Sequence, residues 1–212
     1  MPAQEEDNDA VKLGPLPSDS VARGRSRLIE QEARRLTRIV EDMFVLARAD
    51  AGHPTLRPAL FHLDELVAET ARMAGVLAAQ AGVRIETPAG SDRFFCGDEG
   101  LLRQMIQNLL DNSLKHTPAG GVVRIQLESE KTGYMLTVSD TGAGIPKDAQ
   151  QQIFDRFYRV DEARERPETA SGSGAGLGLP IARWIAEAHG GSLELRRSDE
   201  TGSTFVVFLP HA

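Results

Sequence analysis

The chain has 212 residues, a formal net charge of −7 and a single cysteine. This length accommodates one globular domain and a smaller appendage. The acidic balance argues against nucleic acid as a partner, because a phosphate backbone calls for a surplus of lysine and arginine. One cysteine excludes an internal disulfide and favours a reducing, cytoplasmic compartment. The sequence shows no secretory signal pattern and no apolar run long enough to span a bilayer, so we expect a soluble chain.

The N-terminal part of the chain divides at about residue 26. Residues 1–25 mix proline, glycine, serine and acidic residues without apolar periodicity, which predicts a disordered leader. Residues 26–50 carry apolar residues at steps of three and four, which predicts an amphipathic helix that ends before Gly52. The apolar stripe consists of Ile29, Leu36, Ile39, Val40, Met43, Leu46 and Ala47. Such a stripe favours a partner helix, and docking onto the chain's own domain is the alternative.

The remainder alternates strand-like and helix-like patterns. We expect strands at 59–63, 83–87, 93–96, 122–128, 134–140, 192–197 and 203–209, and helices at 64–80, 98–116, 147–153 and 180–189. Asp64 is predicted to cap the first of these helices, and Asp98 to open the second. Cys96 is expected to be a small apolar filler at a strand end rather than a reactive thiol.

The helix predicted after Asp98 carries a polar row beside its apolar face. Asn108, Asn112 and Lys115 recur at i, i+4 and i+7, so they share one side of the helix. Asparagine has middling helix propensity and competes for backbone hydrogen bonds. Two asparagines in register are therefore more often tolerated for a site than chosen for helicity.

A carboxylate and two glycines follow the predicted strand at 134–140. Asp140 ends the alternating run, and Gly142 and Gly144 come one residue apart behind it. The glycines let the backbone approach a flat ligand, and a fixed carboxylate accepts a hydrogen bond from an exocyclic amine. This combination suits an adenine ring, although the same spacing also describes an ordinary turn after a strand.

A glycine-rich stretch precedes the predicted helix at 180–189. Residues 172–179 read Gly-Ser-Gly-Ala-Gly-Leu-Gly-Leu, and such a loop before a helix N-terminus is an anion site. Its spacing fits neither the dinucleotide fingerprint nor the P-loop. Residues 161–173 are charged, interrupted by proline and then rich in serine and glycine, which predicts a mobile loop. Ahead of that loop, Phe154 and Phe157 are expected to anchor the chain to the core.

Four segments now stand in a fixed order: Asn108 to Lys115, Asp140 to Gly144, Phe154 to Arg159, and Gly174 to Leu179. As a set they resemble the N, G1, F and G2 boxes of the catalytic ATP-binding domain of bacterial sensor histidine kinases. The resemblance covers residues 58–210, and the helix at 26–50 resembles the second helix of that family's dimerisation domain. It implies a two-layer α/β sandwich, a mixed sheet backed by helices, preceded by one long helix. The implied domains are a partial dimerisation segment at 26–52 and a catalytic domain at 56–212.

The resemblance implies ATP and Mg²⁺ as cofactors. Asp140 would bond the adenine amine, and Asn112 would supply an oxygen to Mg²⁺, which otherwise keeps water and phosphate ligands. His116 would lie beside the nucleotide or at a solvated helix end, and Arg159 would contact phosphate or form a surface salt bridge. The residues assigned to the nucleotide site are Asn108, Asn112, Lys115, His116, Asp140, Gly142, Gly144, Ile145, Phe157, Arg159, Gly174, Ala175, Gly176, Leu177, Gly178 and Leu179.

The phosphoacceptor half of the family pattern has no match in this sequence. The family transfers phosphate to a histidine that is followed by an acidic residue, and none of the five histidines here has that neighbour. The chain is therefore expected to be either part of a longer kinase or an acceptor-less relative. The implied partners are a phosphoacceptor histidine domain, a response regulator and, in a full-length kinase, a second copy, with membrane contact only through regions N-terminal to it.

Three alternatives remain beside the kinase hypothesis. A gyrase- or chaperone-type ATPase shares this nucleotide pocket but carries a carboxylate where this chain has Asn108, and an amide is a poor base. An anti-sigma serine kinase is disfavoured by the first helix and by the aromatic run at 154–158. A non-enzymatic adaptor would use the apolar stripe of the first helix as its docking face.

Overall fold

The computed structural model describes residues 33, 36, 37, 39–47, 56–87, 92–160 and 175–211. The chain forms two compact units, Met1–Glu41 and Asp42–Ala212. In the first unit, residues 33, 36, 37 and 39–41 are helical, within the helix predicted from sequence. The leader predicted at 1–25 and the loop predicted at 161–173 lie outside the described residues.

The second unit is built on a five-stranded mixed sheet in the order β2-β4-β5-β7-β6. Its strands are β2 (Arg84–Glu86), β4 (Val122–Glu130), β5 (Gly133–Asp140), β6 (Ser192–Asp199) and β7 (Gly202–Pro210). Only β2 pairs in parallel, with β4, and the other neighbours are antiparallel. A separate antiparallel pair joins β1 (Ala59–His62) to β3 (Phe94–Gly97).

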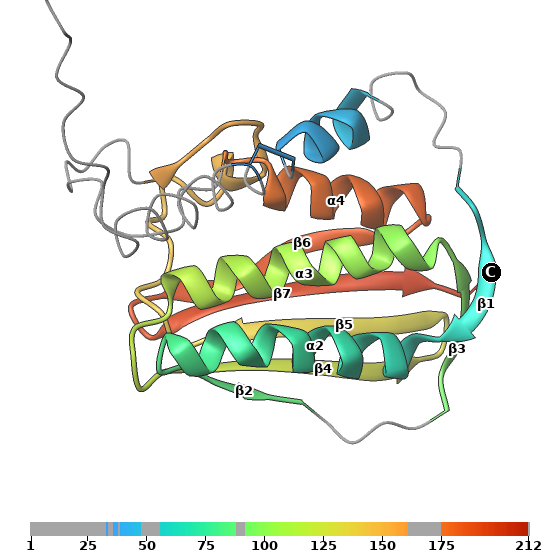
Figure 1. Cartoon of the computed structure of the whole chain (residues 1–212), viewed down its shortest axis with the longest axis horizontal. Helices are drawn as coiled ribbons and strands as arrows, with labels where there is room; N and C mark the ends of the chain where they lie inside the picture. Colours follow the sequence, from blue (N-terminus) through green and yellow to red (C-terminus); the bar gives the residue numbers. More distant parts are fainter. Residues whose placement is uncertain are drawn as a thin grey trace, which may run out of the picture. The chain divides into compact units, whose positions relative to one another are not determined.

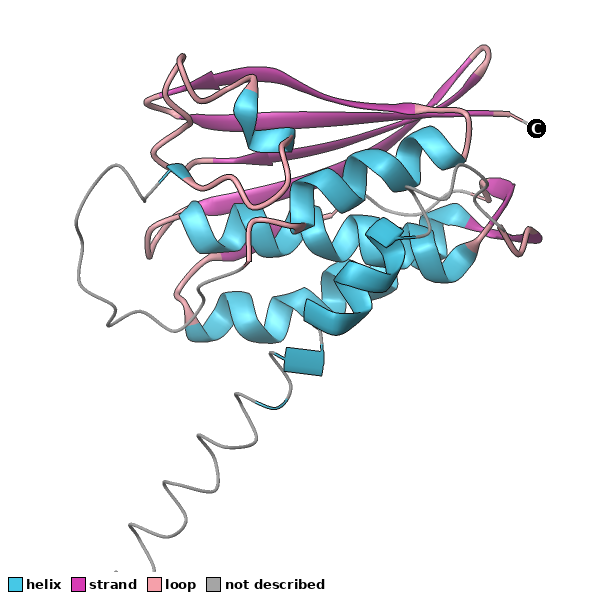
Figure 2. Cartoon of the chain, turned by 90° about the horizontal axis from the view of Figure 1, so that it is seen from above, coloured by secondary structure: helices cyan, strands magenta, loops and turns pink. Residues whose placement is uncertain are grey.

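Three helices cover one face of this sheet: α2 (Leu63–Gln80), α3 (Glu99–His116) and α4 (Gly178–Ala188) (Figure 1). Seen from above, sheet and helices form two layers (Figure 2). Alternate residues of β5, namely Tyr134, Leu136 and Val138, are buried in the hydrophobic core. The predicted two-layer α/β sandwich is confirmed. A short 3₁₀ helix, η1 (Gln152–Phe154), stands where a helix was expected at 147–153. No helix among the described residues is long and apolar enough to cross a membrane.

Helix α3 forms as its sequence predicts. Asp98 caps it, because its Oδ1 accepts a hydrogen bond from the backbone N–H of Leu101 at 3.1 Å. The apolar face is fully buried, and its members are Leu102, Met105, Ile106, Leu109, Leu110 and Ser113. This packing fixes the orientation of α3 and so of the polar row beside its apolar face.

Two expectations about neighbouring elements are wrong. Asp64 does not cap α2; it lies in the first turn, and its Oδ1 accepts from the backbone N–H of Arg93 at 3.1 Å. Cys96 is exposed rather than a buried filler. Successive strand residues point to opposite faces, and in β3 the inward position belongs to Phe95.

Residues 42–47 continue the predicted first helix into the second unit. Asp42, Val45 and Leu46 are buried, and Val45 and Leu46 belong to the hydrophobic core. Gln104 Nε2 on α3 donates to Asp42 Oδ1 at 3.2 Å. Met43 and Phe44 are exposed. This short stretch therefore docks onto its own domain with one face and leaves another apolar face open.

Candidate functional site

Asp140 is a buried carboxylate at the end of β5, with 9 % of its surface exposed. Its Oδ1 accepts hydrogen bonds from the backbone N–H groups of Gly142 at 2.9 Å and Ser203 at 3.2 Å. Burial raises the pKa of Asp140, and these two bonds and the charge of His116 only partly oppose that effect. Among the described residues, no hydrogen bond reaches Oδ2. The carboxylate is thus held by one oxygen and offers the other as an acceptor.

Ser113 lies on the buried face of α3 near this carboxylate. Its side chain also lowers the pKa of Asp140, although no hydrogen bond of ordinary geometry joins the two groups. Within the described part of the chain, Ser113 Oγ has no hydrogen-bond partner. A buried hydroxyl without a partner costs free energy, so this atom is a candidate contact for a ligand or water.

The loop after Asp140 packs tightly on both sides. A Cβ at Gly142 would strike the carbonyl oxygen of His116, the last residue of α3. Gly144 has φ +70°, and a Cβ there would strike the carbonyl oxygen of Asp199 at the end of β6. The two glycines therefore let the loop sit between the C-terminal end of α3 and the β6–β7 hairpin.

Further along α3, Asn108 meets the start of α4. Its Nδ2 is buried and has no hydrogen-bond partner among the described residues. A Cβ at Gly178, the first residue of α4, would come within 3.7 Å of the Asn108 Cβ and Cγ atoms. Asn112 is half-buried one turn away, and Lys115 is exposed in the last turn. The predicted polar row thus runs from the start of α4 to the Asp140 loop.

The spacing along α3 sets the size of the candidate site. Asn108 and His116 are eight residues apart, which is about 12 Å of helix at 1.5 Å per residue. One end of this row carries the buried carboxylate, and the other carries a buried amide beside a helix N-terminus. In the part of the chain that the structure describes, no side chain caps the N-terminus of α4, whose first N–H groups and dipole favour an anion.

The F and G2 segments are joined by one backbone hydrogen bond. The N–H of Phe157 donates to the carbonyl of Gly176 at 3.0 Å. Gly176 has φ +70°, and a Cβ there would lie 2.8 Å from the Phe157 carbonyl carbon. Phe157 itself has φ 64°, a strained value for a residue with a large side chain. The two chain ends that flank residues 161–174 are therefore held together.

The two phenylalanines of this segment behave differently. Phe154 is half-buried and meets Phe205 edge-to-face at 6.5 Å between ring centroids, so it anchors the chain as expected. Phe157 does not anchor the loop to the core, because 59 % of its surface is exposed. Its strained backbone is held by the bond to Gly176 rather than by side-chain packing.

The other predicted site residues fall around these segments. Leu177 is buried, and Ala175 and Leu179 pack against the core. Arg159 and Ile145 are half-buried. Gly174 lies outside the described residues. The structure thus brings the N, G1 and G2 segments together along α3 and holds the F segment against the G2 segment.

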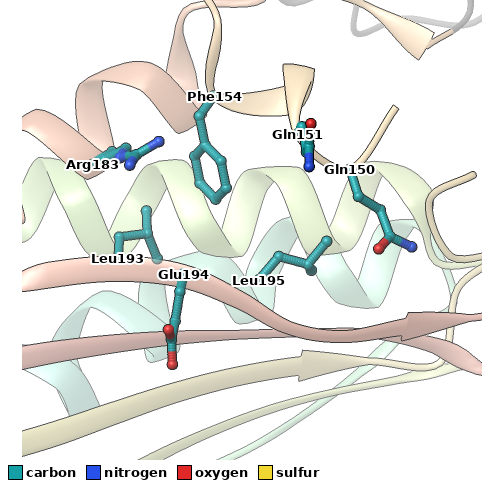
Figure 3. A pocket seen from close by; sticks show the side chains of 7 residues that line it. All are labelled: Gln150, Gln151, Phe154, Arg183, Leu193, Glu194 and Leu195. Carbon is teal, nitrogen blue, oxygen red and sulfur yellow. The ribbon is translucent and has the colours of Figure 1, made fainter. Parts of the chain in front are cut away.

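A separate open pocket of about 380 Å³ lies between η1, α4 and β6 (Figure 3). Its lining residues are Gln150, Gln151, Phe154, Arg183, Leu193, Glu194 and Leu195. The Arg183 guanidinium lies 5.1 Å from the centroid of the Phe154 ring. None of the predicted nucleotide residues lines this pocket, so it is distinct from the row along α3.

Sequence reasoning missed the serines that hold the carboxylate loop. Ser203 donates its backbone N–H to Asp140 from 63 positions away, and the Ser198 hydroxyl accepts from the Ile145 N–H at 2.7 Å. Both contacts depend on the pairing of β5 with β7 and of β7 with β6. In the sequence, the Gly202-Ser203 pair at the start of the last predicted strand could have pointed to this contact, but only if that strand was known to pair with β5.

Comparisons with known proteins agree with this geometry. The family model for the histidine kinase-, DNA gyrase B-, and HSP90-like ATPase matches residues 97–212. Sensor-like histidine kinase SenX3 of Mycolicibacterium smegmatis is 34 % identical over 192 residues, which cover 91 % of this chain and 49 % of SenX3. Sensor histidine kinase RppB of Synechocystis is 35 % identical over 183 residues, 86 % of this chain and 39 % of RppB. The chain thus spans half or less of these relatives.

A solved structure covers nearly the whole chain. The crystal structure of full-length ShkA in complex with AMPPNP superposes on this chain with a TM-score of 0.74 at 26 % sequence identity. The match covers 94 % of this chain and 41 % of the ShkA chain. The resemblance to a sensor histidine kinase catalytic domain is confirmed. On its fold, its family match and its relatives, the chain belongs to the histidine kinase-, DNA gyrase B- and HSP90-like ATPase family.

Proposed function

We propose that this chain is the phosphate-donor half of a sensor histidine kinase. It binds Mg-ATP along α3 and passes the γ-phosphoryl group to a histidine on an acceptor domain. The observation that carries the proposal is the row on α3. The buried acceptor Asp140 lies at one end, and at the other, beside Gly178, lies Asn108, whose Nδ2 has no partner among the described residues. The AMPPNP complex of ShkA supports a nucleotide of this kind.

Asp140 serves the base end of the nucleotide. Its Oδ1 is held by the N–H groups of Gly142 and Ser203, which leaves Oδ2 to accept from the adenine amine. Because the carboxylate is buried, this bond replaces little water and discriminates strongly against a base without the amine. Gly142 and Gly144 let the loop after Asp140 pack against the backbone of His116 and of Asp199, which a Cβ at these positions would strike.

The asparagines serve the phosphate end. Amide oxygens suit Mg²⁺, and the buried Asn108 Nδ2, which has no hydrogen-bond partner among the described residues, supports a ligand at this end of the row. Asn112 is the residue that would hold the ion, with Asn108 one turn away. When bound, Mg²⁺ neutralises phosphate charge and orients the transferring group. Lys115 and the N-terminus of α4 complete a positive environment for the phosphates.

The segments around residues 161–174 serve as the cover of the phosphate site. The hydrogen bond between Phe157 and Gly176 joins the two segments where they flank this stretch. Arg159 would contribute to the cover from the F side, and residues 175–179 from the G2 side. In phosphoryl transfer the protein contributes chiefly position and charge, so these parts are sufficient for a donor site.

The proposed partners are an acceptor histidine domain, a response regulator and a second copy of the full-length kinase. Support for helix pairing comes from the first helix, where Leu36, Val40, Met43 and Phe44 are all exposed. Apolar residues at these steps form one stripe, which a second helix would bury. We place this reaction in the cytoplasm, where ATP and response regulators are found.

Transfer is favoured over ATP hydrolysis by the chemistry at Asn108. Hydrolysis needs a carboxylate to activate water at this position, and an amide cannot take the proton. The half-buried Asn108 and Asn112 therefore fit metal and phosphate contacts better than a water-activating role.

Labelled ATP distinguishes these reactions. The chain is incubated with Mg²⁺ and [γ-³²P]ATP, alone and with an acceptor domain whose phosphoacceptor histidine is followed by an acidic residue. We expect acid-labile phosphate on the acceptor domain, none on the chain alone, and none with Asn112→Ala. Acid-labile phosphate on any of the chain's own histidines, or acid-stable phosphate on serine or threonine, would contradict the proposal.

A further inference from the structure

One hydroxyl links the Asp140 loop to the hairpin that holds the carboxylate. Ser198 Oγ on β6 accepts from the backbone N–H of Ile145 at 2.7 Å and lies 2.9 Å from Ser203 Oγ on β7. The backbone N–H of Ser203 in turn donates to Asp140 Oδ1. Ser198 thus touches both structures that surround the carboxylate, although it lies outside the four segments that identified the site.

The geometry of the loop makes this link important. Asp140 is restrained within its own loop by the Gly142 N–H and from the hairpin by the Ser203 N–H. If the loop shifts relative to the hairpin, these two donors move apart and the carboxylate rotates. Ser198 resists that shift because its single oxygen binds the loop and the hairpin at once.

A second bridge keeps the loop folded without Ser198. Gln150 Nε2 donates to the Ile145 carbonyl at 2.9 Å and to the Ser198 carbonyl at 3.3 Å. Only the second of these acceptors belongs to β6, and it is a backbone atom that any residue at position 198 provides. Removal of the Ser198 hydroxyl is therefore expected to loosen the loop and leave the fold intact.

We infer that Ser198 is a positioning residue of the base site, which fixes the orientation of Asp140 and so selects adenine. This inference rests on the proposed function, because it assigns Asp140 to the adenine amine. Ser198 does not contact the nucleotide; it acts through Ile145 and Ser203 on the carboxylate.

The test compares two nucleotides on three variants. Calorimetry measures the affinity for ATP and for inosine triphosphate, which carries an oxygen where adenine carries its amine. Since one hydrogen bond contributes about 0.5–1.5 kcal/mol, Ser198→Ala is expected to weaken ATP binding about 2- to 10-fold and inosine triphosphate binding less than about twofold. Ser198→Thr keeps the hydroxyl and restores ATP affinity. Ser192→Ala, an exposed serine on the same strand, changes neither affinity.

The outcomes separate the inference from the proposed function. An equal loss for both nucleotides would show a merely structural role, and no loss for either would show no role; both overturn the inference. If the wild type binds no ATP, the proposed function fails, and amide exchange still decides the anchoring. The Ile145 N–H should exchange at least about tenfold faster in Ser198→Ala than in wild type or Ser192→Ala. An unchanged Ile145 exchange rate would overturn the inference on its own.

Discussion

The two ends of the polar row on α3 are built in opposite ways. At the base end, Asp140 is restrained by two backbone donors, and its loop is tied to the hairpin through Ser198. At the phosphate end, Asn108 Nδ2 is buried and without a partner among the described residues, and Phe157 holds a strained backbone conformation. Both ends carry one buried side-chain atom without a partner among the described residues, Ser113 Oγ at the base end and Asn108 Nδ2 at the phosphate end. They differ in that the carboxylate of the base end is already restrained, whereas the phosphate end adds a strained backbone.

This difference separates the end that would select the nucleotide base from the end that would respond to ligand binding. A preorganised acceptor pays little on binding and discriminates between bases. A buried polar atom without a partner and a residue at positive φ store free energy that can be released when the site fills. Under the proposed function, the base end would decide which nucleotide binds, and the phosphate end would decide what changes on binding.

The largest effect is expected when the base end is broken with Asp140→Asn. A hydrogen bond to a charged group contributes about 1.5–3 kcal/mol, so ATP affinity should fall about 10- to 100-fold. Stability at neutral pH should stay equal or rise, because burial disfavours the charged form that the substitution removes. Nucleotide titration and thermal unfolding measure the two quantities. A variant that loses stability together with affinity would contradict a preformed, costly carboxylate.

The contact between Phe157 and Gly176, which joins the segments covering the phosphate site, is tested by Gly176→Ala. A residue with Cβ at φ +70° is strained by about 1–3 kcal/mol, and this Cβ would also crowd Phe157. The thermal midpoint should fall, and ATP should bind more weakly, with the loss in contacts to phosphate rather than to base. Adenosine therefore serves as the comparison ligand, and its affinity should be unchanged. Equal losses for ATP and adenosine would place Gly176 outside the phosphate end.

A smaller effect is expected for Asn108→Ala. The buried Nδ2 makes no hydrogen bond among the described residues, so its removal should change stability by less than about 1 kcal/mol. Mg-ATP affinity should fall about 2- to 10-fold. The control is the neighbouring Leu109→Ala, which empties a fully buried position and should cost about 2–5 kcal/mol. If Asn108→Ala destabilises the domain as much as Leu109→Ala does, the asparagine is structural.

The smallest effect is the pH dependence of Asp140. Burial raises its folded pKa above the ordinary 3.8, so its protonated form stabilises the fold below that value. That contribution is lost as the pH rises through the raised pKa. ATP affinity follows the opposite direction, because binding needs the carboxylate. As the pH falls from 7, the wild type should lose ATP affinity at a higher pH than that at which ordinary aspartates protonate. Over the same range, the free energy of unfolding of the wild type should rise relative to that of Asp140→Asn. If stability and ATP affinity depend on pH in the same way in the wild type and in Asp140→Asn, Asp140 is not the titrating group of the site.

Much of the fold and half of the site follow from local patterns. The Asn108 row and the Asp98 cap are visible because helix periodicity and capping act over one to three turns. Asp140 at a strand end beside two glycines is visible for the same reason. Asp64 shows the limit of local reasoning: its carboxylate looked like a cap but binds Arg93, which lies 29 positions away.

The contacts that complete the site are long-range and were not predictable from local patterns. Ser198 and Ser203 reach the Asp140 loop only after β5, β7 and β6 pair in that order. The positive φ of Phe157 and the exposure of its side chain leave no signal in the local sequence. Sequence patterns therefore indicate the residues that we propose for the chemistry, and the sheet order shows which residues hold Asp140 in place.

The most direct test of the account is a calorimetric titration of the wild-type chain and of Asn112→Ala with ATP, each with and without Mg²⁺. We predict that the wild type binds ATP and that Mg²⁺ tightens this binding. Asn112→Ala should still bind ATP through its base, and its affinity should no longer depend on Mg²⁺. Absence of ATP binding by the wild type would contradict the assignment of the row on α3, and an Mg²⁺ dependence that persists in Asn112→Ala would contradict the metal role of Asn112.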